Sequence, residues 1–167
     1  MDDKQINFES DNRPSWDEVY SEMAQVVASR STCSRAYVGA VITKNNAILA
    51  TGYNGAISGE DHCLTHGHIL DDNDHCIRTV HAEINALMQC AKIGQAVEGA
   101  TMYCTFFPCL SCVKAIIQAG IKTIKFISEY KMNTKETQYA LHLLKLANID
   151  VYILEGKGVA KKYVYNQ

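Results

Sequence analysis

The hydrophobic residues of this chain change several times between helical and strand-like spacing. Ser15-Trp16-Asp17-Glu18 has the form of a helix capping box, and apolar residues then recur at helical spacing, which predicts a helix ending near Ser31. Two β-branched stretches follow at 38–43 and 47–53. Lys44-Asn45-Asn46 separates them and predicts a hairpin.

The chain after residue 80 repeats this alternation. The pattern predicts helices at 81–93, 109–119 and 134–147, and strands at 100–105, 124–128 and 151–154. Gly120 is expected to cap the second of these helices. The order of elements predicts a three-layer α/β/α fold around a five-stranded mixed sheet, with the later strands parallel through right-handed crossovers.

Three segments have no clear periodicity. Residues 1–14 are expected to form an N-terminal arm, and the basic, aromatic tail 156–167 has no assignment. The insertion at 54–79 is rich in Gly, Asp, His and Cys and is too long for a simple connection. We expect one domain over 1–167, with its core at about 16–154.

Composition narrows the class of protein. A chain of 167 residues with 47% hydrophobic content fits one compact domain rather than two. A net charge of -2 and a pI near 6.3 offer no basic surface for a long nucleic acid, which favours a small substrate. No apolar run is long enough to span a membrane, and residues 1–13 lack the hydrophobic segment of a secretion signal. Seven cysteines, several of them near histidines, suit thiolate ligands in a reducing compartment. We therefore expect a cytoplasmic protein, in the host cytoplasm if a phage encodes it.

Two short motifs carry the chemistry. His81-Ala82-Glu83 supplies an imidazole and a carboxylate, and Pro108-Cys109-Leu110-Ser111-Cys112 supplies two thiols. A structural zinc site is closed by four protein ligands, whereas His81, Cys109 and Cys112 leave the fourth position to a water. Glu83 is then free to carry protons. This combination is the signature of zinc-dependent nucleobase deaminases.

Each motif has a simpler interpretation by itself. A CxxC pair can be a redox pair, an incomplete zinc clip or a chance occurrence, and a histidine at a helix start is often only a cap. Their joint occurrence favours a catalytic zinc site. Pro108 fits the first turn of a helix, which would direct both thiolates and the free helix amides to one place.

Five segments resemble the deoxycytidylate (dCMP) deaminase family, over about residues 16–154. They are Val38-Gly39-Ala40-Val41-Ile42, Gly52-Tyr53-Asn54-Gly55, His81-Ala82-Glu83-Ile84-Asn85-Ala86, Pro108-Cys109-Leu110-Ser111-Cys112 and Ile117-Gln118-Ala119-Gly120-Ile121-Lys122. The resemblance implies a cytidine-deaminase-like fold and hydrolysis of dCMP to dUMP and ammonia, which would supply dUMP for thymidylate synthesis. In that chemistry Glu83 takes a proton from the zinc-activated water, protonates ring N3 as C4 is attacked, and later protonates the leaving amine.

Substrate contacts are expected by the same resemblance. Asn54 would bond the sugar 3′ hydroxyl, the backbone amide of Ala82 would meet the pyrimidine edge, and Tyr130 would contact the phosphate. The Gly52–Gly55 segment could also be a plain turn, and Tyr130 an exposed structural residue. Phe106 and Phe107 are candidates for packing on the base, although aromatic residues at a strand end often belong to the core.

A second, structural zinc is expected in the insertion. Some family members carry one, with cysteines at the positions of Cys33 and Cys63, and we add His68 and His75, with Cys76 as the substitute for His75. The alternative is a polar loop with solvated histidines. A metal would order a loop that has too little apolar content to order itself.

The resemblance further implies a homo-hexamer that is activated by dCTP and inhibited by dTTP, with Mg²⁺ accompanying the effector. Arg35 and Lys92 are candidate effector contacts, as are Arg30 and Asn54, although single basic residues are more often solvated surface. Three other functions stay open. They are a deaminase acting on dCTP, a tRNA adenosine deaminase, which uses the same chemistry on a flipped base, and a non-enzymatic zinc-binding module.

Overall fold

The computed structural model describes residues 13–72, 74–129, 134–156 and 158–163. A six-stranded sheet in the order β2-β1-β5-β6-β7-β8 lies at its centre. Its strands are β1 (Gly39–Lys44), β2 (Ala47–Tyr53), β5 (Thr101–Phe106), β6 (Thr123–Ser128), β7 (Asp150–Glu155) and β8 (Val159–Lys162). β5, β6 and β7 run parallel, whereas β1 is antiparallel to both β2 and β5, and β8 is antiparallel to β7.

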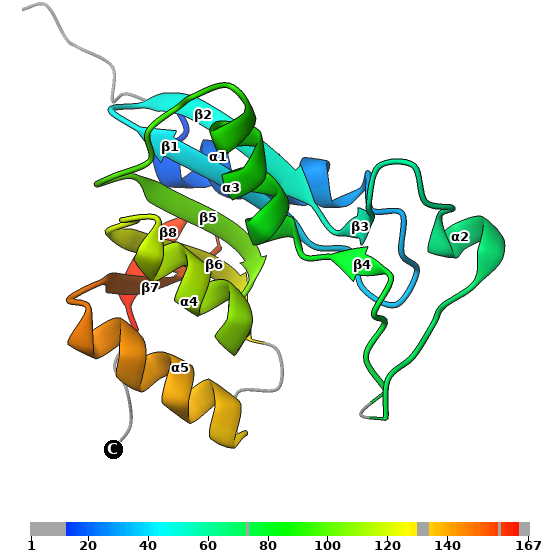
Figure 1. Ribbon diagram of the computed structural model, residues 1–167. Helices are drawn as coiled ribbons and strands as arrows, with labels where there is room; N and C mark the ends of the chain where they lie inside the picture. The colour runs from blue at the N-terminus through cyan, green and yellow to red at the C-terminus, as the bar shows by residue number, and fades with distance from the viewer. Residues whose placement is uncertain (1–12, 73, 130–133, 157, 164–167) are drawn as a thin grey trace, which may run out of the picture.

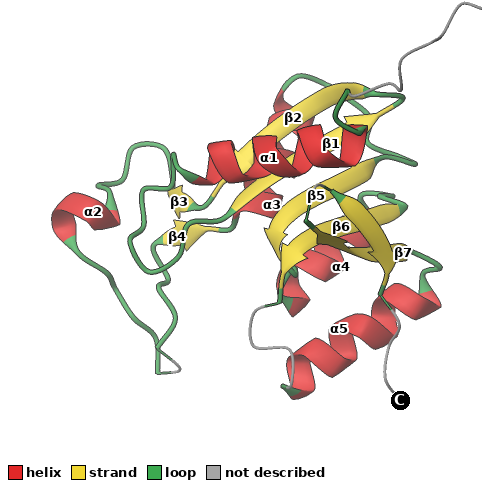
Figure 2. Cartoon of the chain, turned by 180° about the vertical axis from the view of Figure 1, so that it is seen from behind, coloured by secondary structure: helices red, strands yellow, loops and turns green. Residues whose placement is uncertain are grey.

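Helices cover both faces of this sheet (Figures 1 and 2). Helix α1 (Trp16–Ala28) lies on one face, and α3 (Ala82–Lys92) and α4 (Leu110–Gln118) lie on the other, with α5 (Lys135–Leu146) packed against α4. The predicted three layers and the parallel later strands are confirmed. The sheet has six strands rather than five, because the unassigned tail supplies β8, a short and mostly exposed edge strand.

Local signals in the sequence set several element boundaries. The Ser15 hydroxyl accepts a hydrogen bond from the Glu18 amide at 3.1 Å and caps α1, as the capping box predicts. Asn45 and Asn46 have φ of 51° and 59°, the left-handed pair that a tight hairpin turn requires. Gly120, with φ of 81°, ends the α4 region as expected.

The main core lies between the sheet and helices α3 and α4. Ile42, Met102, Ile124 and Phe126 are fully buried there. Helices approach the sheet closely where a strand has glycine. A Cβ at Gly39 would lie 2.0 Å from the Ala24 carbonyl oxygen of α1, so this position excludes any side chain.

The insertion projects away from the body of the molecule (Figure 1). Strands β3 (Gly55–Ala56) and β4 (Thr79–Val80) pair at its base, and the short helix α2 (Cys63–His66) lies at its far side. An isolated bridge joins Leu70 and Cys76. Over the part of the chain that the structure describes, no helix has the length and apolarity to cross a membrane.

Candidate active site and second metal cluster

Helices α3 and α4 start side by side and bring the two motifs together. His81 is the N-cap of α3 and Cys109 the N-cap of α4, so Pro108 lies just before the N-cap and not in the first turn as predicted. The Nδ1 atom of His81 is 3.4 Å from the Sγ atoms of both Cys109 and Cys112. Tetrahedral zinc, with bonds of about 2.3 Å to sulfur and about 2.0 Å to nitrogen, would separate such atoms by about 3.6 Å. The three side chains therefore fit a zinc ion that keeps a fourth position open.

The electrostatics of this cluster favour thiolate. The hydrogen bond with Cys112 lowers the pKa of Cys109 to about 4 despite burial, and His81 contributes further. The same hydrogen bond, together with burial, raises the pKa of Cys112. Both thiols lie at the positive N-terminal end of α4, which also stabilises negative charge. A divalent cation would neutralise the remaining negative charge of the two thiolates and displace the proton that Cys109 and Cys112 share.

Glu83 lies in the first turn of α3 and is only 4% exposed. Burial raises the pKa of its carboxyl, and the nearby Cys112 is placed to hydrogen-bond to it. Fully buried Cys104 is close enough for its charge to interact with that of Glu83. A raised pKa brings a carboxyl closer to the condition in which it can both accept and release a proton, as a proton carrier must.

Close packing holds α3 in place above β2. A Cβ at Gly52 would lie 2.2 Å from the Ala82 carbonyl oxygen, so only glycine permits this approach. The Asn85 side chain donates a hydrogen bond to the Tyr53 carbonyl at 2.8 Å. The Gly52–Gly55 segment therefore positions the helix that carries His81 and Glu83.

The Asn54 side chain is hydrogen-bonded to backbone groups of the loop before β1. Its Oδ1 accepts a hydrogen bond from the Val38 amide and its Nδ2 donates to the Ala36 carbonyl, both at 2.9 Å, and the residue is 7% exposed. One N–H and one lone pair of the carboxamide remain beyond these two bonds. Ala82, the first residue of α3, has an amide that the helix itself does not need.

The aromatic candidates differ in position. Phe107 is buried and packs on Phe126 and Tyr163, so it belongs to the core. Phe106 instead lines a hollow of about 480 Å³ at the ends of β5 and β6, together with Tyr37 and other residues. Tyr130 lies outside the described residues.

A second cluster gathers four potential ligands at the base of the insertion. Its members are Cys33, Cys63, His68 and Cys76, and their ligand atoms all lie within 4.8 Å of one another. Cys33 Sγ is 3.7 Å from His68 Nδ1, and Cys63 Sγ is 3.7 Å from Cys76 Sγ. These separations are close to the roughly 3.6–3.8 Å expected around tetrahedral zinc, so the donor set fits a closed site.

The thiols of this cluster shift one another's pKa, and a bound cation would relieve the repulsion between their thiolates. Burial and the neighbouring Cys76 and Cys33 raise the pKa of Cys63 to about 11. Burial acts on Cys76 in the same direction, but hydrogen bonds from His68 and from the backbone outweigh it and lower its pKa to about 7. The Nε2 atom of His68 lies 3.2 Å from the Ser34 hydroxyl, which orients the ring.

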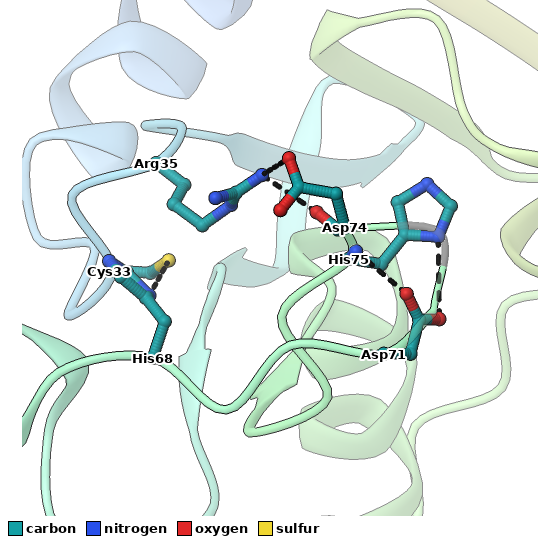
Figure 3. A network of polar contacts seen from close by, with 6 residues as sticks. All are labelled: Cys33, Arg35, His68, Asp71, Asp74 and His75. Atoms are coloured by element: carbon teal, nitrogen blue, oxygen red, sulfur yellow. Dashed lines mark hydrogen bonds and ion pairs between the residues drawn. The ribbon is translucent and has the colours of Figure 1, made fainter.

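The structure does not place His75, the predicted fourth ligand, in this cluster, and Cys76, its predicted substitute, lies there instead. Figure 3 shows the His75 ring turned to Asp71 and away from Cys33 and His68. Its Nδ1 lies 3.6 Å from the Asp71 carboxylate, and its side chain is 66% exposed. Neighbouring residues in an extended segment point to opposite sides, so the Leu70–Cys76 bridge directs Cys76 inward and His75 outward.

The candidate effector contacts have different surroundings. Arg35 donates hydrogen bonds to the Asp74 carbonyl at 2.7 Å and carboxylate at 3.2 Å, so it ties the loop before β1 to the insertion (Figure 3). Arg30 and Lys92 are exposed, the latter at the end of α3.

Sequence reasoning missed several residues that hold the site together. Ser31, Asn85 and Thr105 make the hydrogen bonds that join the strand ends around it. Asn85 lies within the helix motif and could have been noticed there. Ser31 and Thr105 lie in no such motif and have no comparable signal.

Comparisons with known proteins agree with this geometry. A family model described as "Cytidine and deoxycytidylate deaminase zinc-binding region" matches residues 14–128. ComE operon protein 2 of Bacillus subtilis is 43% identical over 143 residues, covering 86% of this chain and 73% of that protein. The deoxycytidylate deaminase of Saccharomyces cerevisiae is 35% identical over 158 residues, 90% of this chain, which spans about half (48%) of the yeast protein. The crystal structure of dCMP deaminase from the cyanophage S-TIM5 in complex with dCMP and dUMP superposes with a TM-score of 0.72 at 34% identity, over 84% of this chain and 98% of that one.

Proposed function

Because the chain belongs to the cytidine and deoxycytidylate deaminase family, we propose that it hydrolyses dCMP to dUMP and ammonia. One observation carries this proposal: among the described residues, buried Glu83 lies beside a cluster of three potential metal ligands. A closed structural site would need a fourth protein ligand, and the buried Glu83 carboxyl would have no chemical role beside it.

The residues of this site have two roles, zinc binding and proton transfer. Zinc held by His81, Cys109 and Cys112 would supply a water whose pKa lies near neutrality. Glu83 accepts one proton from the attacking water and donates it to ring N3 as C4 is attacked. It then accepts the second proton, from the new C4 hydroxyl, and donates it to the departing amine. Its raised pKa suits both directions of transfer.

The surrounding residues hold the nucleotide. The Ala82 amide meets the pyrimidine edge, and the remaining N–H and lone pair of Asn54 meet the sugar 3′ hydroxyl. The similarity to the yeast deoxycytidylate deaminase and to the cyanophage enzyme in complex with dCMP and dUMP supports this choice of substrate.

A substrate series tests the proposal. Ammonia release is measured with dCMP, dCTP, deoxycytidine, cytidine and a tRNA anticodon stem-loop at equal concentrations. We expect dCMP to be preferred. Preference for dCTP would move the activity to the triphosphate, preference for the stem-loop would favour a tRNA adenosine deaminase, and no ammonia from any compound would favour a non-enzymatic zinc module.

We also propose a structural zinc at the second cluster, with Cys76 and not His75 among its ligands. The four donors have separations close to those of a tetrahedral site and come from three separate segments of the chain. Metal analysis of the purified protein is expected to find two zinc ions per chain. One zinc per chain would remove this second site.

Assembly and regulation follow from the family resemblance only. We propose a homo-hexamer that dCTP, with Mg²⁺, activates and dTTP inhibits. Light scattering with and without each nucleotide, combined with rate curves, tests this. A sigmoidal curve that dCTP makes hyperbolic is expected, and a monomer with hyperbolic kinetics throughout would contradict it.

A further inference from the structure

Three consecutive residues, Ser31-Thr32-Cys33, join the second metal cluster to the segment that carries Asn54. Cys33 contributes its Sγ to the cluster. The Thr32 hydroxyl accepts a hydrogen bond from the Ala56 amide at 3.1 Å, and its carbonyl accepts one from Leu64 at 3.2 Å. This tripeptide therefore contacts the base of the insertion, its short helix and its metal cluster at once.

Ser31 provides the connection to Asn54. Its hydroxyl is 2.9 Å from the Asn54 carbonyl oxygen, and it is 3.2 Å from the Cys33 amide nitrogen, which donates to it. The same oxygen also lies 3.1 Å from the Cys33 carbonyl and 3.3 Å from the Ala36 carbonyl. Because a hydroxyl has one proton, the shortest contact, to Asn54, is the best placed to receive it.

The surroundings of Ser31 make this link hard to replace. The residue is 4% exposed, so water cannot readily take the place of its hydroxyl. The Asn54 carbonyl has one other donor, the Thr32 amide, at a longer 3.3 Å. Asn54 in turn holds Val38 and Ala36 through its carboxamide, so a shift of its backbone would move the whole substrate-facing loop.

We propose that Ser31 is a positioning residue: its buried hydroxyl connects Cys33 of the second cluster to Asn54 and thereby sets the affinity for the nucleotide substrate. This inference rests on the proposed function, in which Asn54 contacts the sugar. It assigns to the second cluster an effect on substrate binding in addition to ordering the insertion.

Kinetics with dCMP provide the first test. Ser31→Ala is expected to raise KM about tenfold while kcat stays within about twofold, because ground-state and transition-state contacts to the sugar weaken together. Ser21→Ala is the matched control, since Ser21 is similarly buried but its hydroxyl bonds only to Glu18 within α1. An unchanged KM in Ser31→Ala, or an equal rise in the control, would overturn the proposal.

A double-mutant cycle then tests the connection itself. Cys76→Ser removes one ligand of the second cluster without touching Ser31. If the cluster acts on KM through Ser31, the effects of Ser31→Ala and Cys76→Ser combine to clearly less than their product. Independent, multiplying effects on KM would contradict the coupling.

Amide hydrogen exchange supplies a readout that needs no activity. In Cys76→Ser, exchange of the peptide covering residues 50–56 is expected to accelerate, whereas His75→Ala leaves it unchanged because His75 lies outside the cluster. Unaltered exchange in Cys76→Ser would refute the link even if Ser31→Ala fails to fold. If wild-type protein does not deaminate dCMP, the proposed function fails, but this measurement still decides whether the cluster and Asn54 are connected.

Discussion

Gly52 is the position where a single methyl group should displace the active site. In Gly52→Ala the new Cβ would lie 2.2 Å from the Ala82 carbonyl oxygen and 2.4 Å from the Ala86 amide nitrogen, both backbone atoms that no rotamer change can move. Ordinary contact requires α3 to retreat by about 1 Å, and a misplacement of about 1 Å costs on the order of 100-fold in rate. Because α3 carries His81 and Glu83 while Cys109 and Cys112 stay on α4, the metal ligands would also separate.

The assay is the steady-state deamination of dCMP, followed by loss of cytosine absorbance, beside zinc analysis and circular dichroism. We expect kcat/KM to fall about 100-fold and the overpacked protein to lose about 1–3 kcal/mol of unfolding free energy. Gly156→Ala is the matched control, because a Cβ there meets nothing within 4 Å. A Gly52→Ala protein with wild-type kcat/KM would refute the claim that close packing of α3 on β2 sets the geometry of the site.

Three further predictions test other parts of the structure. Cys76→Ser should reduce zinc from two ions to one per chain by metal analysis, whereas His75→Ala should keep both, and the reverse result would restore His75 as the ligand. Lys125→Met should cost about 1–3 kcal/mol in urea unfolding, because the mostly buried Asp17 carboxylate, bonded to Lys125 at 2.6 and 2.7 Å, would lose its charged partner and keep only the Tyr103 hydroxyl. Lys162→Met, which breaks an exposed pair, should cost less than about 0.5 kcal/mol, and equal losses would contradict this ranking. Burial and Glu129 raise the pKa of Tyr163 from 10.0 to about 12, so the folded state holds that proton longer than the unfolded state and stability should fall as pH rises between these values. Tyr163→Phe should flatten this fall in urea titrations, and an unchanged pH slope would show that Tyr163 does not contribute.

Periodicity and capping predicted most of the body of the molecule. The long helices and five strands each bury an apolar face, so their spacing is visible in the sequence. β8 was not predicted because its residues are mostly exposed and its order comes from pairing with β7. The buried contact of Asp17 with Tyr103 and Lys125 was likewise not predicted, because it joins α1 to two distant strands.

The two metal clusters were predictable to different degrees. The catalytic ligands lie at helix starts with fixed spacing, so the motifs alone indicated which residues would meet. In the insertion no periodicity indicates orientation, and a choice between adjacent His75 and Cys76 depends on which side of an extended segment each faces. The role of Asn54 was only partly visible, since its carboxamide holds Val38 and Ala36 through contacts that no motif encodes.

Glu83→Gln tests the central claim most directly, because it keeps the shape of the buried side chain and removes its ability to carry protons. The measurement is dUMP and ammonia formed from dCMP by the zinc-loaded variant, beside its zinc content. We predict equal amounts of the two products from wild type, a loss of at least about 10³-fold in kcat in the variant, and unchanged zinc. A variant that retains zinc and turns over dCMP within about tenfold of wild type would contradict the assignment of Glu83 as the proton carrier.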